Sequence, residues 1–158
     1  MDPRERQWGK ADKELADRLE VRDVIERYSD AVTHRLWADA AATFHEDAVW
    51  KAGAPISIEL KTRDGIIASL KAGICRMDFL AQMTHSVTIT VDGDKATART
   101  IVHELGRNSS QKSGVCLIGA YHDTLSRRAG RWAFDRREFV VIFSDTAWVA
   151  GATGANLP

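Results

Sequence analysis

The hydrophobic pattern of this chain changes its period once, and that change limits the fold more than any other feature. From about Ala11 to His34 apolar residues recur at the spacing of an amphipathic helix; they are Leu15, Leu19, Val21, Val24, Ile25, Tyr28 and Val32. After Met83 the pattern alternates at every second residue, which is typical of strands with one buried face. Helices first and strands afterwards predict an α+β domain, with the helices on one face of an antiparallel meander.

Shorter patterns predict the remaining elements. Trp37 to Phe44 and Thr62 to Ile74 are expected to be helices, the second because polar cap residues precede an apolar face. The predicted strands cover residues 48–51, 85–91, 95–105, 115–127 and 131–143. The Asp92-Gly93 pair lies between two alternating runs, which is a strong hairpin signal. Strands this long cannot stay flat, so the sheet should curl and leave a pocket between its concave face and the helices.

Length and charge narrow the class of protein. A chain of 158 residues with 44% hydrophobic residues fits one domain, residues 1–158, with 1–10 expected to be flexible and 145–158 expected to form a tail or a pocket flap. Lys+Arg 22 balance Asp+Glu 22, so no nucleic-acid partner is expected. The first residues are charged and no apolar run reaches the roughly 18 residues of a membrane span. We therefore expect a cytoplasmic protein with no membrane partner.

Several kinds of functional site have no support in the sequence. The five histidines form no HExxH pattern or similar ligand spacing, so no metal is expected. The chain also has no GxGxxG, GxxxxGK[ST] or GxSxG motif, so we expect neither a nucleotide cofactor nor a serine nucleophile. What remains is chemistry without any cofactor, in which an acid and a base act in a dry pocket by proton abstraction with elimination, or by proton shuttling.

Two strands carry candidate bases. Strict alternation places His85 on the same face as Val87, Ile89 and Val91, where it is either a core histidine or the base of an active site. On the next strand, Glu104 shares the inward face with a set of small apolar residues that includes Ala96, Ala98 and Val102. Glu104 is then either a base, a partner for His85, or a solvated residue at the rim.

Three stretches carry a family resemblance: LEVRDVIERYSDAVTHRLWADAAATFHEDAVW, TRDGIIASLKA and GAYHDTLSRRAGRWAFDRREF. Over nearly the whole chain the sequence resembles the SnoaL-like branch of the NTF2-like superfamily. The resemblance implies a cone of helices and curved sheet around a deep pocket, and assembly as a homodimer or homotrimer. It implies little about activity, because the superfamily includes dehydratases, dehydrochlorinases, isomerases, cyclases, C–C lyases and binding proteins.

The resemblance also suggests roles for single residues. In the members that act on scytalone, bile acids and hexachlorocyclohexane, a histidine early in the strand after the third helix takes a proton, and an aspartate of the first helix orients it. His85 falls on the histidine position and Thr33 on the aspartate position, where a hydroxyl cannot stabilise an imidazolium as a carboxylate does. Tyr28 falls on a helix tyrosine, and Arg137 on an arginine that binds the leaving group.

Other residues are expected around this centre. Asp30 and His34 lie four apart on the first helix and are candidates to compensate for the missing carboxylate. Trp50, Phe79, Met83 and Tyr121 are expected as core or pocket wall, which suits an aromatic substrate. Arg136 competes with Arg137 for the inward direction, and a bulge would exchange them.

The sequence thus predicts a cofactor-independent lyase that eliminates water, halide or formaldehyde from a small aromatic or ring-containing apolar substrate. One alternative is an isomerase or cyclase resembling ketosteroid isomerase or the polyketide cyclases, with Glu104 or Asp30 as the shuttling base. The other is a non-catalytic small-molecule binding protein of the same fold.

Overall fold

The computed structural model describes residues 3–147 and 149–151, which contain three α-helices, one short 3-10 helix and six strands. The elements are α1 Pro3–His34, α2 Trp37–Ala42, β1 Phe44–Ala52, β2 Ile58–Lys61, α3 Arg63–Ile74, β3 Phe79–Asp92, β4 Lys95–Asn108, η1 Ser109–Gln111, β5 Ser113–Arg128 and β6 Arg131–Asp145. Along these residues, no helix combines the length and the apolar composition that crossing a membrane requires.

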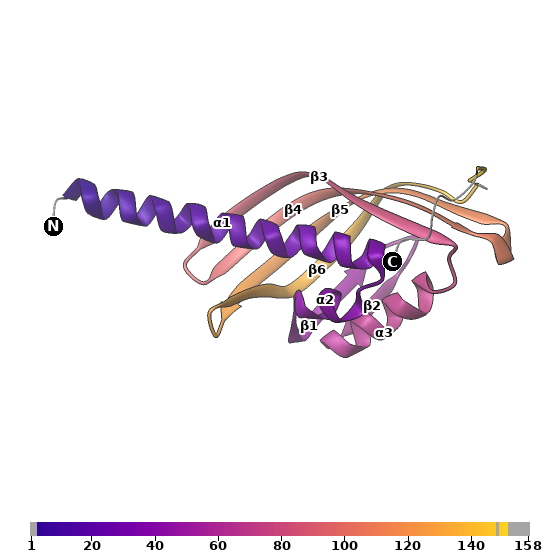
Figure 1. Ribbon diagram of the computed structural model, residues 1–158, viewed down its shortest axis with the longest axis horizontal. Helices are drawn as coiled ribbons and strands as arrows, with labels where there is room; N and C mark the ends of the chain where they lie inside the picture. The colour runs from indigo at the N-terminus through magenta and orange to yellow at the C-terminus, as the bar shows by residue number, and fades with distance from the viewer. Residues whose placement is uncertain (1–2, 148, 152–158) are drawn as a thin grey trace.

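The strands form one sheet in the order β2-β1-β6-β5-β4-β3. The run from β3 to β6 is the predicted antiparallel meander, whereas β1 joins the far side of β6 in parallel. Figure 1 shows α1 lying along this sheet, with α2 and α3 at the end where β1 and β2 lie. The predicted α+β architecture is confirmed, and the sheet is mixed because of β1.

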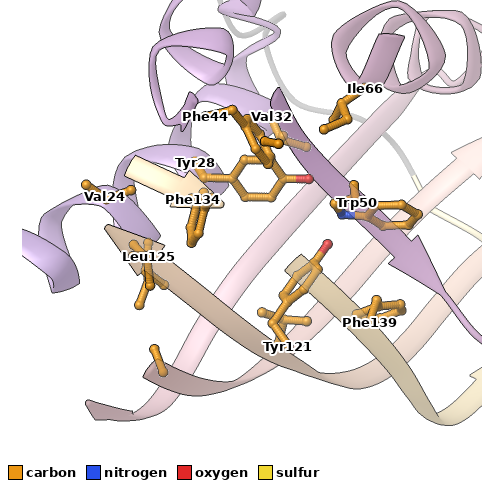
Figure 2. Packing of buried hydrophobic residues seen from close by; sticks show 14 of the residues in the cluster. Val24, Tyr28, Val32, Phe44, Trp50, Ile66, Tyr121, Leu125, Phe134 and Phe139 are labelled. Atoms are coloured by element: carbon orange, nitrogen blue, oxygen red, sulfur yellow. The ribbon is translucent and has the colours of Figure 1, made fainter. Parts of the chain in front are cut away.

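The core lies between α1 and the concave face of the sheet. Tyr28 of α1 packs edge-on against Phe44, Phe134 and Tyr121, with ring centroids 5.6, 6.2 and 6.2 Å away (Figure 2). The helical stripe from Val21 onwards is buried as predicted, but Leu15 and Leu19 are 58% and 59% exposed. They precede the buried stripe of α1, and the first turns of this helix extend past the strands (Figure 1).

Several boundaries differ from the sequence prediction. Residues 3–10 are helical and belong to α1, α2 ends at Ala42 rather than at Phe44, and β1 begins at Phe44 rather than at residue 48. Strand β2 was not predicted, because its four residues are too few for a periodic signal. The predicted cap of α3 is confirmed, since Thr62 Oγ1 accepts the Gly65 N–H at 3.2 Å.

Three bulges decide which side chains face the pocket. On β3, Thr84 pairs with Val102 but Val87 pairs with Thr100, so β3 carries one extra residue. The pairing of β5 with β6 has two similar shifts, one between Ile118 and Gly119 and one between Thr124 and Leu125. At the second shift, β6 carries Asp135 as the extra residue. Beyond each extra residue, the side chains of that strand that would have faced inward face outward, and the reverse.

Candidate active site

A pocket of about 280 Å³ lies between the concave face of the sheet and the helices. Its volume is near the lower end of the range for small-molecule sites. The lining residues are Tyr28, Val32, Trp50, Ile56, Leu70, Gly73, Ile74, Met77, Leu80, Gln82, Glu104, Val115, Tyr121 and Phe139. Most are apolar, and the polar groups come from Glu104, Gln82, Trp50 and the two tyrosines.

Glu104 carries the only carboxylate among the lining residues. It faces inward with Ala98 and Val102, as the alternation of β4 predicts, because no bulge interrupts that strand. Gln82 Nε2 donates a hydrogen bond to Glu104 Oε1 at 2.5 Å. Burial raises the pKa of Glu104, and the Gln82 hydrogen bond offsets this only in part.

Gln82 connects this carboxylate to α1. Its Oε1 accepts a hydrogen bond from Ser29 Oγ at 2.9 Å, which orients the amide so that Nε2 points at Glu104. Thr33 binds the backbone of the same residue, because its hydroxyl accepts the Gln82 N–H at 3.0 Å and contacts the Gln82 carbonyl oxygen at 3.4 Å. Since β3 is the edge strand, Thr33 satisfies backbone groups that no neighbouring strand can reach.

The predicted position of His85 is wrong. Its side chain is exposed, and it stacks on His103 with ring centroids 6.4 Å apart and planes at 24°. The bulge between Thr84 and Val87 is the reason, because before it the inward residues of β3 are Leu80 and Gln82. The pocket-facing place opposite Thr33 belongs to Gln82, which the sequence interpretation missed; alternation counted from Leu80 would have found it.

Tyr28 and Tyr121 form the polar end of the pocket. Their ring centroids lie 6.2 Å apart, with the ring planes at 84°. Figure 2 shows the two phenol oxygens directed toward one another, Tyr28 from α1 and Tyr121 from β5. Burial raises the pKa of both phenols, and the charge of Arg137 partly opposes this shift.

Arg137, and not Arg136, faces inward, because the bulge at Asp135 shifts the alternation of β6. It is fully buried, and its Nε and Nη2 donate to Asp123 Oδ1 and Oδ2 at 2.9 and 3.1 Å. Asp123 is only 2% exposed, and this ion pair compensates its buried charge. Burial lowers the pKa of Arg137, but Asp123 and the two phenols together outweigh it and raise the pKa.

Aromatic rings separate Arg137 from the pocket. Its Cζ lies 3.8 Å from the ring centroid of Tyr121, 4.0 Å from that of Phe134 and 4.3 Å from that of Tyr28. Arg137 is not among the lining residues, so the direct contact with a leaving group that the resemblance implied has no place here. Its positive charge therefore acts on the pocket only indirectly, through the phenol rings of Tyr28 and Tyr121 on which it stacks.

The other predicted wall residues divide into two groups. Trp50 and Tyr121 line the pocket, as expected. Phe79 and Met83 do not, because they alternate with the inward Leu80 and Gln82; Arg107 stacks on Phe79 at 5.6 Å, and Met83 is 38% exposed. Asp30 and His34 pair with each other at 3.2 Å on the solvent side of α1, so they do not compensate for Thr33.

Two further regions bear on the predicted site. The described residues contain no group of three or more His, Cys, Asp or Glu side chains placed to hold a metal ion. Of the predicted flap, residues 145–147 and 149–151 are described; Asp145 ends β6, and Thr146 O accepts the Gly114 N–H at 3.1 Å. Trp148 and residues 152–158 lie outside the described residues, so the flap stays a prediction.

Solved structures share this fold at low sequence identity. A protein from Novosphingobium aromaticivorans, provisionally assigned as a scytalone dehydratase, aligns with a TM-score of 0.78 at 21% identity, over 92% of this chain and 97% of that one. A hexachlorocyclohexane dehydrochlorinase from Novosphingobium barchaimii aligns at 0.76 and 19%, over 90% and 96%. A Nostoc punctiforme protein of unknown function with a cystatin-like fold aligns at 0.67 and 15%, over 80% and 91%.

The sequence itself also has a family match. Among curated proteins no sequence matches the chain significantly. The family model of the SnoaL-like domain, in contrast, matches residues 13–138, from the buried part of α1 to the middle of β6. That span contains every residue of the pocket except Phe139. The chain therefore belongs to the SnoaL-like domain family, within the NTF2-like superfamily.

Proposed function

We propose that this protein is a cofactor-independent lyase, which removes a proton from a small, largely apolar ring compound and expels a leaving group. The observation that carries the proposal is Glu104, the one carboxylate among the residues that line the pocket, which is half-buried and has a raised pKa. A carboxylate whose pKa is raised is a stronger base than one in water, and is better matched to a weakly acidic C–H or O–H group.

The surrounding groups suit this role. Gln82 occupies Oε1 of Glu104, so Oε2 is the oxygen that takes the proton. Negative charge then develops on a substrate oxygen, where the phenol pair of Tyr28 and Tyr121 donates a hydrogen bond. Arg137 stabilises that charge from behind the rings, and the apolar wall excludes water from the reacting atoms.

The solved structures favour a lyase among the activities of the fold. Two of the similar proteins carry the names of a dehydratase and a dehydrochlorinase, and both names describe elimination. The inward carboxylate also favours a second candidate, an isomerase in which protonated Glu104 returns the proton to another carbon atom. The first step is common to both, and the two differ in whether a small molecule is lost.

The proposed function is tested by proton exchange. Ring ketones, β-hydroxy ketones, ring halides and hydroxymethyl aromatics are incubated in deuterated water without any cofactor, and NMR and ultraviolet spectra report exchange and products. We expect activity in the wild type and a loss of about 100-fold or more in Glu104→Gln. His85→Ala is the matched control and should keep full activity, because His85 lies on the opposite face of the sheet. Equal activity in Glu104→Gln, or no turnover of any compound that binds, contradicts the proposal.

Assembly and location belong to this proposal as well. We expect a cytoplasmic protein, as in the sequence prediction, and the resemblance implies a homodimer or homotrimer. On the outer face of the sheet, Met83, Ile118 and Phe143 are 38%, 36% and 51% exposed and lie in one row across the strands, with His103 of β4 between Met83 and Ile118. An apolar row of this kind is consistent with self-association, and light scattering of the purified chain measures its mass.

A further inference from the structure

Two leucines of α1 lie on the side of the helix that faces away from the sheet. Leu15 and Leu19 are one helical turn apart and are 58% and 59% exposed. Asp17 and Val21 follow them by two positions, which is about 200° around the helix, and both are buried. The two leucines therefore point away from the core, and the described part of the chain leaves them uncovered.

The N-terminal turns of α1 have little support from the rest of the molecule. Position 9 and positions 11–16 are all exposed, and Asp17 is the first buried residue of the helix among those described. Figure 1 shows these turns extending past the strands, where no other element lies beside them. Helical turns without tertiary packing are only marginally stable in water, so a contact with a partner would stabilise them.

The residues around the two leucines follow the spacing of a coiled-coil seam. Five exposed positions of α1 succeed one another by three, four, three and four residues, as a and d positions do; they are Asp12, Leu15, Leu19, Arg22 and Glu26. We call these five residues the outer stripe. The SnoaL-like family model begins at residue 13, so the stripe starts outside the part of the chain that the family shares.

The outer stripe is complementary to a second copy of itself in the antiparallel direction. Leu15 and Leu19 are centred on position 17, and so are Asp12 and Arg22. One two-fold axis beside position 17 therefore brings Leu15 of one copy to Leu19 of the other, and also brings Asp12 to Arg22. A parallel arrangement in register would instead place each charge beside its own copy, where like charges repel.

Arg22 can take part in such a contact without losing its partner in α1. Its Nε donates to Glu26 Oε1 at 2.7 Å, and this pair is exposed to solvent. The bond holds the guanidinium along the stripe, and the donors of the two Nη groups point elsewhere. They can reach the Asp12 carboxylate of a second helix.

We propose that a second copy of this chain binds the outer stripe, with the two α1 helices antiparallel and the two-fold axis beside position 17. The contact buries Leu15 and Leu19 of both copies and pairs Asp12 of each copy with Arg22 of the other. Between these two charged residues α1 runs about 15 Å, so the interface belongs to the small class that supports weak complexes. The inference is independent of the proposed lyase function, and the outer face of the sheet stays free for other contacts.

The test is charge reversal, read by sedimentation velocity of the full chain at concentrations up to about 1 mM. Asp12→Arg places like positive charges across the contact, and Arg22→Asp places like negative charges there. Each variant alone should self-associate about tenfold more weakly than the wild type, or less still. In an equal mixture of the two variants, both charge pairs of the mixed dimer have opposite signs again, so association should return to the wild-type level.

The matched control reverses the same charges on another side of α1. Glu20 and Arg27 are exposed, and they directly follow Leu19 and Glu26, about 100° around the helix from the stripe. Glu20→Arg and Arg27→Asp change the net charge exactly as the test variants do. Alone and mixed, they should associate as the wild type does, which separates the specific contact from general attraction between oppositely charged chains.

A second measurement uses only the wild type. The amide hydrogens of residues 11–16 should exchange more slowly as the protein concentration rises, because the contact suppresses opening of these turns, whereas those of α3 should not change. A wild type that stays monomeric, single variants that associate as the wild type does, or a mixture that does not recover overturns the inference. So does exchange in residues 11–16 that ignores concentration, or a control mixture that associates more strongly than the wild type.

Discussion

Gln82 Nε2 donates to Glu104 Oε1 at 2.5 Å, and this hydrogen bond links the candidate base to α1 through Ser29. The Ser29 hydroxyl donates to Gln82 Oε1, so the amide cannot flip without losing both contacts. A carboxylate held in this way keeps one oxygen fixed and presents the other to the pocket. The edge strand β3 therefore positions the base on β4 without supplying a titratable group itself.

Replacement of Gln82 should move the pH dependence of activity. Gln82→Met removes the hydrogen bond that lowers the pKa of Glu104, so that pKa rises further above its ordinary range. Because Glu104 acts as the base, the rise of kcat/KM should shift to higher pH, which a pH–rate profile measures. Thr33→Val is the control, since it removes only contacts to the Gln82 backbone and should cost about 1 kcal/mol of stability with the profile unmoved. Identical profiles for Gln82→Met and the wild type would show that the amide does not tune the base.

Glu104→Gln should stabilise the fold while it removes activity. The pKa of Glu104 is raised in the folded state, so its ionisation opposes folding. Wild-type stability is therefore fully retained below the ordinary glutamate pKa of about 4.3, and falls as the pH rises from there through the raised value. The variant keeps an oxygen that accepts from Gln82 and has no charge to bury.

The measurement is the free energy of unfolding in urea at a series of pH values. The stability difference between Glu104→Gln and the wild type should be small in acid and grow toward neutral pH. The exposed Glu20→Gln removes the same charge from the surface of α1 and corrects for the change in net charge. A stability difference that is constant with pH, or that favours the wild type at neutral pH, would contradict the prediction that ionisation of Glu104 opposes folding.

The sequence predicted what depends on periodicity alone. The stripe from Val21 to Val32, the meander and the inward direction of Glu104 follow from uninterrupted patterns, and the structure has all three. The short β2 and the parallel pairing of β1 with β6 have no periodic signal, because both depend on contacts between distant segments.

The residues of the site were harder to predict from the sequence, because a bulge has no signature in a single sequence. On β3 the residues on both sides of the bulge alternate regularly, so the count from Val87 back to His85 gives the wrong face. The same irregularity on β6 selects Arg137 over Arg136. The resemblance to a histidine-dependent site strengthened the error at His85, and the true pocket residue, Gln82, carries no charge that would draw attention to it.

The buried ion pair of Arg137 and Asp123 should show strong coupling. Arg137→Met leaves the Asp123 carboxylate buried without a partner and should cost about 3–5 kcal/mol of stability. The double variant Arg137→Met with Asp123→Leu removes both charges and should recover most of that loss. Urea unfolding of the wild type, both single variants and the double variant gives the coupling energy. Additive losses would mean that the two side chains act independently, against the bidentate geometry.

Gly119→Ala should narrow the pocket, because the added methyl group pushes on the ring of Phe139. A methyl group at Gly119 would lie 2.2 Å from Cζ and 2.4 Å from Cε2 of Phe139, and 3.0 Å from the backbone oxygen of Val140. The Phe139 ring contacts Tyr121, with centroids 4.8 Å apart, and lines the pocket, so it can only yield toward the ligand. Overpacking of this kind costs about 1–3 kcal/mol.

We therefore expect lower stability and weaker binding of α-tetralone, with a smaller effect on cyclohexanone, which needs less room beside Phe139. Calorimetry with both ketones measures the selectivity, and thermal unfolding measures the cost to the fold. Gly53→Ala is the control, because a methyl group there meets no atom within 4 Å, although the Gly53 N–H also bonds to the Phe139 carbonyl. Equal weakening of both ketones would mean that Phe139 does not limit the size of the ligand, and that the ring yields away from the pocket.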